Sequence, residues 1–186
     1  GRGGMLSIAE PVAVVEARLS GDVTVAAVNG PSATVVSGDP VRLAELLAEV
    51  EGEGGRARML PVDYASHGPQ VEELREEILR LLAEVRPQAA RITMVSAMTG
   101  LKLEGTELTA QYWYDSLRGR VEFSRAVEAL ADHGVFVESS AHPVLTAPVA
   151  DALENLGVEA VVTGTLRRED GGADRMLASL AEVYVR

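Results

Sequence analysis

One stretch decides the fold: Val23-Thr24-Val25-Ala26-Ala27-Val28-Asn29-Gly30-Pro31-Ser32-Ala33-Thr34-Val35-Val36-Ser37-Gly38. It contains two short apolar runs rich in Val and Ala, and such runs favour β-strands when turn residues bound them. The four residues between the runs, 29–32, are typical of a turn. The stretch therefore predicts an antiparallel hairpin, around which the neighbouring segments can be placed.

Segments on both sides extend the hairpin into a small α/β lobe. An apolar run over 5–9 predicts a strand, and Pro11 opens a helix that ends at about Leu19, because proline at the first helical position loses no hydrogen bond. After the hairpin, Asp39 predicts the N-cap of a helix that ends at the glycines of 52–55. The run 57–62 predicts a fourth strand. The order β-α-β-β-α-β over residues 3–63 predicts a ferredoxin-like lobe.

The remaining residues, 64–186, show strands that alternate with helices. We predict buried strands at 91–96, 135–138 and 158–163, a loop or small hairpin at 99–107, and helices at 69–85, 124–133, 146–156 and 174–185. Such alternation is typical of a parallel sheet covered on both faces. Three strands are few for a free-standing sheet, so we expect this part to complete a larger sheet whose first strands lie upstream.

Composition narrows the classes of function. The 186 residues carry 17 Lys and Arg against 28 Asp and Glu, and the net charge of −11 disfavours a general nucleic-acid or anionic-membrane binder. Cysteine is absent, which excludes disulfides and thiolate metal sites. Without a long apolar run or a signal-peptide pattern, we expect a cytoplasmic protein. We expect no metal and no tightly bound cofactor, because no metal-ligand spacing and no phosphate-binding loop occur.

His67 is the strongest candidate for chemistry among the three histidines. It follows the strand-like run 57–62 and precedes a helix that begins at Pro69. A histidine at the exit of a strand can be held rigidly beside a cleft, as a general base requires. The alternative is a surface or helix-capping histidine. We interpret His133 as a cation at a helix end and His142 as a structural residue.

Six segments in this order resemble the acyltransferase domain of modular polyketide synthases, within the malonyl-CoA:acyl carrier protein transacylase family. They are Gly1-Arg2-Gly3-Gly4-Met5, Val28-Asn29-Gly30-Pro31, Tyr64-Ala65-Ser66-His67, Tyr112-Trp113-Tyr114, Leu117-Arg118 and His142-Pro143-Val144-Leu145. The resemblance covers nearly the whole chain. It implies a hydrolase-like parallel α/β core, here residues 64–186, with an inserted ferredoxin-like lobe and an active site between them.

The resemblance also implies a mechanism. A serine in a Gly-His-Ser-x-Gly turn attacks an acyl-CoA, a histidine that His67 matches takes its proton, and the acyl group passes to the phosphopantetheine thiol of an acyl carrier protein. None of the eleven serines here lies in a Gly-x-Ser-x-Gly setting. We therefore expect a C-terminal portion that is inactive alone and whose partners are the upstream half of the domain, a neighbouring ketosynthase and the carrier protein.

The resemblance extends to specificity and orientation. Family members with Tyr-Ala-Ser-His use methylmalonyl-CoA, whereas malonyl-CoA users carry His-Ala-Phe-His, so Tyr64 and Ser66 are predicted to contact the acyl group. Ser66 leaves space that phenylalanine would fill, although one methyl group is worth only about 1–3 kcal/mol of discrimination. Asn29 is a further candidate near the mouth of the site. A main-chain carbonyl of Asp115 or Ser116 is expected to orient the histidine.

The sequence is compatible with two other functions. A ferredoxin-like lobe with an acidic surface suits a non-catalytic binding or interaction module, and the absent serine motif is compatible with it. A hydrolase that releases mischarged acyl groups would share the serine and the histidine. A Gly-x-Ser-x-Gly about a hundred residues upstream would favour an enzyme, and release of free acid without a carrier protein would identify the hydrolase.

Overall fold

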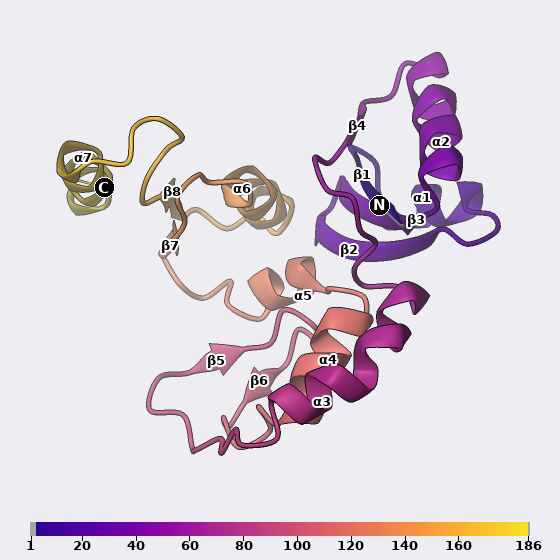
Figure 1. Ribbon diagram of the computed structural model, residues 1–186. Helices are drawn as coiled ribbons and strands as arrows, with labels where there is room; N and C mark the ends of the chain where they lie inside the picture. Colours follow the sequence, from indigo (N-terminus) through magenta and orange to yellow (C-terminus); the bar gives the residue numbers. More distant parts are fainter. Residues whose placement is uncertain (1–2, 186) are drawn as a thin grey trace.

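The computed structural model describes residues 3–185, and its first part follows the predicted order of elements (Figure 1). These elements are β1 (Gly4–Ile8), α1 (Val12–Arg18), β2 (Thr24–Gly30), β3 (Ala33–Gly38), α2 (Pro40–Gly52) and β4 (Ala57–Met59). The strands form one sheet in the order β2-β3-β1-β4, and every neighbouring pair is antiparallel. The predicted hairpin is therefore confirmed as β2 and β3.

Apolar side chains between the sheet and its two helices form the main core of this part. Leu6, Ile8, Val15, Leu43 and Val50 are fully buried there. The predicted cap of α2 is also present, since Asp39 Oδ1 accepts hydrogen bonds from the N–H groups of Val41 and Arg42 at 3.0 and 3.1 Å. Local capping and burial of one helix face thus explain why these residues fold as expected.

The predicted helix 69–85 is confirmed in part, because helical structure covers 69–81 in two pieces of different type. A 3₁₀ helix, η1 (Pro69–Leu74), comes first, and α3 (Arg75–Leu81) follows it. In this segment Val71 is buried, but Leu74 and Leu81 are 46% and 63% exposed. The apolar periodicity therefore did not mark a buried face over the whole length.

The predicted buried strand 91–96 was wrong in its length and in its burial. Only β5 (Met94–Val95) is extended, and it pairs antiparallel with β6 (Lys102–Leu103), while Ile92 is 84% exposed. The segment 99–107, predicted to be a loop or a small hairpin, contains only the strand β6, whose partner β5 lies before it in the sequence. The next helix, α4 (Ala110–Arg118), begins after Thr109, whose side chain accepts the N–H of Tyr112.

The last part contains a parallel pair of strands, β7 (Val135–Glu138) and β8 (Val161–Gly164). Helices α5 (Phe123–Glu128) and α6 (Thr146–Asn155) pack on it around buried Val127, Val149 and Leu153, and α7 (Ala173–Tyr184) lies on the opposite side (Figure 1). Two of the three predicted parallel strands are thus present. Among the helices of residues 3–185, none is both long and apolar enough to cross a membrane.

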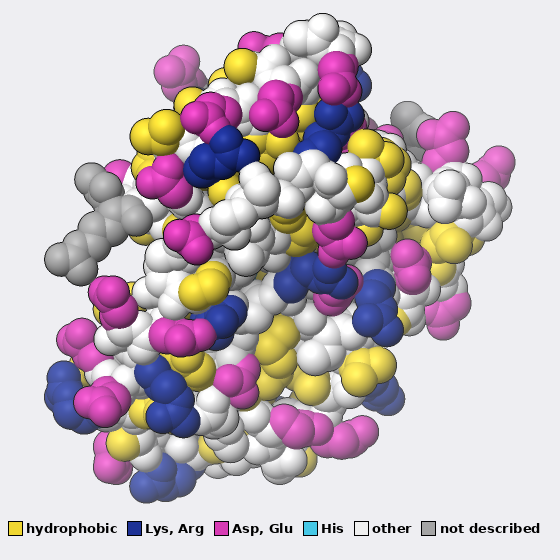
Figure 2. All heavy atoms as spheres, turned by 90° about the vertical axis from the view of Figure 1, so that its right-hand side faces the viewer, with side chains coloured by type: hydrophobic (Ala, Val, Ile, Leu, Met, Phe, Trp, Pro, Cys, Tyr) yellow, Lys and Arg dark blue, Asp and Glu magenta, His cyan; other side chains and the backbone are white. Residues whose placement is uncertain are grey.

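The face of the molecule drawn in Figure 2 is chemically mixed. Acidic and basic side chains alternate over the face in Figure 2, with hydrophobic side chains between them. This face presents no continuous basic surface of the kind that binds a phosphate backbone.

Candidate functional site

His67 lies on the connection between β4 and η1, in a backbone conformation that few side chains adopt. Its φ is 57°, and the only other non-glycine residue with positive φ among residues 3–185 is Glu169. Left-handed backbone costs energy in a non-glycine residue and persists where surrounding contacts enforce it. The fold therefore holds His67 in place at some energetic cost.

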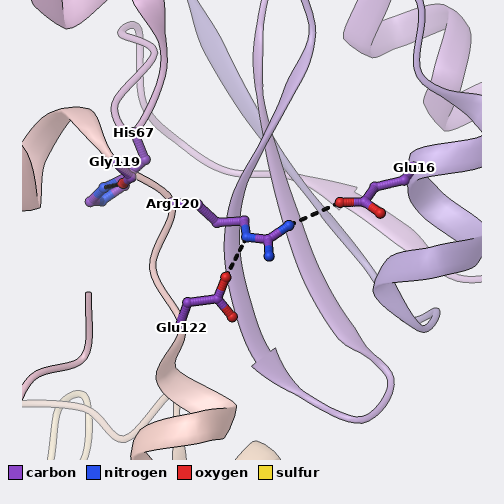
Figure 3. Close-up of polar contacts among 5 residues, drawn as sticks. All are labelled: Glu16, His67, Gly119, Arg120 and Glu122. Carbon is purple, nitrogen blue, oxygen red and sulfur yellow. Dashed lines mark hydrogen bonds and ion pairs between the residues drawn. The ribbon is translucent and has the colours of Figure 1, made fainter. Parts of the chain in front are cut away.

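Two hydrogen bonds to the end of α4 enforce this conformation. The His67 N–H donates to the Leu117 carbonyl at 2.9 Å, and His67 Nδ1 lies 3.0 Å from the Gly119 carbonyl oxygen (Figure 3). A carbonyl oxygen only accepts, so Nδ1 must carry the hydrogen. In the neutral ring, Nε2 then keeps its lone pair and is available to take a proton.

The residue that supplies this carbonyl differs from the prediction. We expected Asp115 or Ser116, but both lie inside α4, where carbonyls point along the helix axis. The Asp115 carbonyl accepts the N–H of Gly119 at 2.7 Å. Gly119 follows the helix with extended backbone, φ −81° and ψ 160°, so its carbonyl is free of the helix ladder and turns to the histidine.

His67 lines an open pocket of about 800 Å³. Tyr64 and Ser66 line it too, together with Gln70, Leu74 and Leu117. Tyr64 is 55% exposed, whereas the Ser66 hydroxyl donates to the Met5 sulfur at 3.3 Å. The structure thus brings three of the predicted site residues together around one cavity.

Asn29 is not brought to this pocket. It lies near the end of β2, and Thr24 at the other end of that strand is the residue close to the His67 loop. The neighbour of Asn29, Gly30, packs so closely on α6 that a Cβ atom would lie 3.1 Å from the Pro148 carbonyl oxygen. The end of β2 that holds Asn29 therefore lies beside α6, away from the His67 pocket.

Segment 119–122, which we call the clasp, joins the His67 site to the first sheet. The Val121 N–H donates to the Ala26 carbonyl and the Val28 N–H donates to the Val121 carbonyl, both at 2.8 Å. This is a short parallel addition to the edge of β2. Arg120 lies between two carboxylates, 2.9 Å from Glu16 and 2.6 Å from Glu122 (Figure 3).

These features can be compared with known proteins. A family model described as "Acyl transferase domain" matches residues 1–186. The chain belongs to the acyl transferase domain family. It is 52% identical over 189 residues to the spectinabilin polyketide synthase system protein NorA' of Streptomyces orinoci, covering 99% of this chain and 5% of that protein. It is 47% identical over 188 residues to the pikromycin polyketide synthase component PikAIII of Streptomyces venezuelae, covering 99% and 12%.

Solved acyltransferase structures share the fold of this family member. The acyltransferase domain from module 8 of the salinomycin polyketide synthase superposes with a TM-score of 0.95 at 50% identity, over 99% of this chain and 45% of that one. A loading acyltransferase from the avermectin synthase gives 0.93 at 36% identity, over 99% and 60%. The chain spans a small fraction of the synthases and about half of these solved acyltransferase chains.

Sequence reasoning missed two parts of this acyl transferase domain. One is the clasp, whose only signal was a glycine after a helix. The other is Glu138 at the end of β7, which accepts the N–H groups of Val144, Leu145 and Thr146 at 2.8–3.1 Å and so caps α6. Burial acts to raise the pKa of Glu138, but these bonds and one from Ser140 outweigh burial and lower it.

The other two histidines lie away from the pocket. His142 Nδ1 accepts the Arg168 N–H at 3.3 Å, and His133 Nδ1 lies 2.7 Å from Asp132. Within residues 3–185, no group of three or more histidine or carboxylate side chains is arranged to hold a metal ion.

Proposed function

We propose that this chain takes part in acyl transfer from an acyl-CoA extender unit, through an acyl-serine, to the phosphopantetheine thiol of an acyl carrier protein during polyketide synthesis. His67 is the general base in this proposal. It takes the proton of the nucleophile and later returns a proton to the leaving thiol, so the covalent intermediate forms and breaks at one site. Membership of the acyl transferase domain family supports this assignment.

One observation carries the proposal: Nδ1 of His67 is engaged by the Gly119 carbonyl while the ring lines a pocket. That arrangement fixes the tautomer in which Nε2 accepts a proton. Because the sequence contains no Gly-x-Ser-x-Gly, we propose that the serine comes from outside these 186 residues. Residues 64–186 are then part of a hydrolase-like core. The strand order β2-β3-β1-β4 supports assigning residues 3–63 to a ferredoxin-like lobe.

We propose methylmalonyl-CoA as the preferred substrate. Ser66 is small, and its hydroxyl is turned to Met5, so it leaves room beside His67 for an α-methyl group. Tyr64, on the rim of the same pocket, is placed to contact the acyl chain. The partners in this proposal are the carrier protein and the neighbouring ketosynthase, in the cytoplasm.

The test uses the acyltransferase that contains this chain. Its intact mass is measured before and after incubation with methylmalonyl-CoA, and then with a carrier protein bearing phosphopantetheine. We expect a methylmalonyl adduct that moves to the carrier protein. Free acid produced without the carrier protein would identify a hydrolase instead, and no adduct at all would overturn the proposal.

The matched variant is His67→Asn. Asparagine tolerates left-handed backbone, and its amide can donate to the Gly119 carbonyl as Nδ1 does, but it has no basic nitrogen. We expect the fold to persist and acyl transfer to fall about 10²–10⁴-fold. Full transfer activity in this variant would refute the base assignment.

A further inference from the structure

Arg118 lies between the two residues whose carbonyls hold His67. Leu117 accepts the His67 N–H, and Gly119 contacts His67 Nδ1. Arg118 is the last residue of α4, so its backbone position determines where both carbonyls point. Anything that fixes Arg118 therefore fixes the geometry around the histidine.

The Arg118 side chain reaches back to the His67 loop. Its Nε and Nη2 atoms lie 3.1 and 2.7 Å from Glu72 Oε1. Glu72 belongs to η1, five residues after His67. The chain from His67 to Glu72 and the chain from Leu117 to Gly119 are thus joined at three points, two at the histidine itself and one at this ion pair.

We propose that Arg118 is a positioning residue that, through Glu72, holds the Gly119 carbonyl against His67 Nδ1 and so keeps the ring in the tautomer with Nε2 free. The expected effect of Arg118 on catalysis rests on the function proposed above, but its expected effect on the His67 tautomer does not. Lysine would not replace Arg118 fully, because two nitrogens of one planar guanidinium share the carboxylate oxygen.

The ion pair is poorly suited to a purely stabilising role. The Arg118 and Glu72 side chains are 33% and 61% exposed, and pairs of this kind contribute little to folding. Other contacts already hold α4 to its neighbours. Tyr114 is buried, and the Arg75 guanidinium lies 5.5 Å from the centre of its ring. Replacing Arg118 should therefore leave the fold intact but no longer hold the Gly119 carbonyl against His67 Nδ1.

The first test reads the tautomer directly by ¹⁵N NMR of the acyltransferase that contains this chain, labelled at histidine, at about pH 8.5, two units above the ordinary imidazole pKa. The signals of His67 are assigned by their loss in His67→Asn. We expect wild-type His67 to be protonated at Nδ1, and Arg118→Ala to contain a clear fraction protonated at Nε2. His133 and His142 serve as internal references. An unchanged His67 tautomer in a folded Arg118→Ala chain would overturn the proposal.

Matched variants separate positioning from general destabilisation. Arg42→Ala also removes an exposed ion pair, with Glu45 on α2, and should leave the His67 tautomer unchanged. Exchanging the partners, Arg118→Glu with Glu72→Arg, should restore much of the wild-type tautomer. If Arg118→Ala does not fold, Arg118→Lys is measured instead and should show a smaller shift; a wild-type spectrum from this lysine variant would also refute the role of the guanidinium fork.

The second test is kinetic and uses the acyltransferase that contains the chain. Misplacing a reacting group by about 1 Å can cost 10²-fold, so we expect kcat of Arg118→Ala to fall about 10- to 100-fold with little change in KM. A rise in KM alone would contradict a positioning role. If wild type transfers no acyl group, the proposed function fails while the NMR result still decides the role of Arg118.

Discussion

At the scale of single residues, the site is built from conformations that sequence alone does not reveal. His67 has φ 57°, and its ring is directed by one carbonyl fifty-two positions along the chain. Strain of this kind is kept when several contacts converge on one residue. The contacts that converge on His67 are its hydrogen bonds to the backbone carbonyls of Leu117 and Gly119.

A double substitution at the pocket tests the proposed preference for methylmalonyl-CoA. Tyr64→His with Ser66→Phe places a large ring where Ser66 now leaves space beside His67. We expect the ratio of kcat/KM for methylmalonyl-CoA to that for malonyl-CoA to fall by about 10- to 100-fold, as one methyl group allows. Competition between the two thioesters measures it. An unchanged ratio would mean that other residues shape the pocket, and Tyr64→Phe is the control that keeps the ring size.

At the scale of elements, side chains that cap the starts of helices fix where α2 and α6 begin. Asp39 caps α2 locally, and its position before Pro40 predicts the start of this helix. Helix α6 is capped at a distance by Glu138, which lies eight positions before Thr146 and on a strand. A carboxylate that accepts several N–H groups at a helix start is favoured as the anion.

The stability of this cap should depend on pH. Because the folded pKa of Glu138 is lowered, its contribution is fully present above the ordinary carboxyl pKa of 4.5 and is lost as pH falls through the folded value. We expect Glu138→Gln to lower the free energy of unfolding by about 1 kcal/mol at pH 7, since the carboxylate is partly exposed. The difference should shrink below pH 4.5.

Urea unfolding of both chains at several pH values measures this difference. Glu159→Gln, on an exposed side chain before β8, is the control and should show no such dependence. A Glu138→Gln deficit that is equally large in acid would indicate a role in packing instead of charge.

At the scale of the whole molecule, the first sheet and the His67 site are joined by the clasp. Val121 adds to the edge of β2, while two residues earlier Gly119 contacts the histidine. Small residues on that strand, such as Ala26 and Ala27, allow the close approach. A displacement of the sheet would therefore move the carbonyl that orients His67.

Breaking the clasp should weaken the connection between the first sheet and the His67 site. Val121→Pro removes the N–H that bonds to Ala26 and leaves that carbonyl without its donor, so we expect a loss of about 1–3 kcal/mol in the free energy of unfolding. Calorimetry and limited proteolysis near residues 119–122 measure it. Val121→Ile keeps the N–H and should be as stable as the wild type. If the proline variant is also as stable as the wild type, the clasp does not contribute to the free energy of unfolding.

Much of the first part was predictable because its signals are local. A turn between two apolar runs defined β2 and β3, and caps defined α2. Local signals misled where burial was decided elsewhere: the apolar residues of 69–85 and 91–96 predict buried segments, yet Leu81 and Ile92 are exposed. Of the site, Tyr64, Ser66 and His67 line one pocket because they are adjacent in sequence, whereas Asn29, distant in sequence, does not line it.

The sequence by itself determined the element order of residues 3–63, the family resemblance and the residue most suited to act as a base. These follow from patterns that repeat over a few positions or from contiguous motifs. Only the tertiary structure decided that Gly119, and not Asp115 or Ser116, contacts the ring, that Glu138 caps α6 and that Arg118 meets Glu72. Each of these contacts depends on where separate elements meet, and that is set by packing of the whole chain.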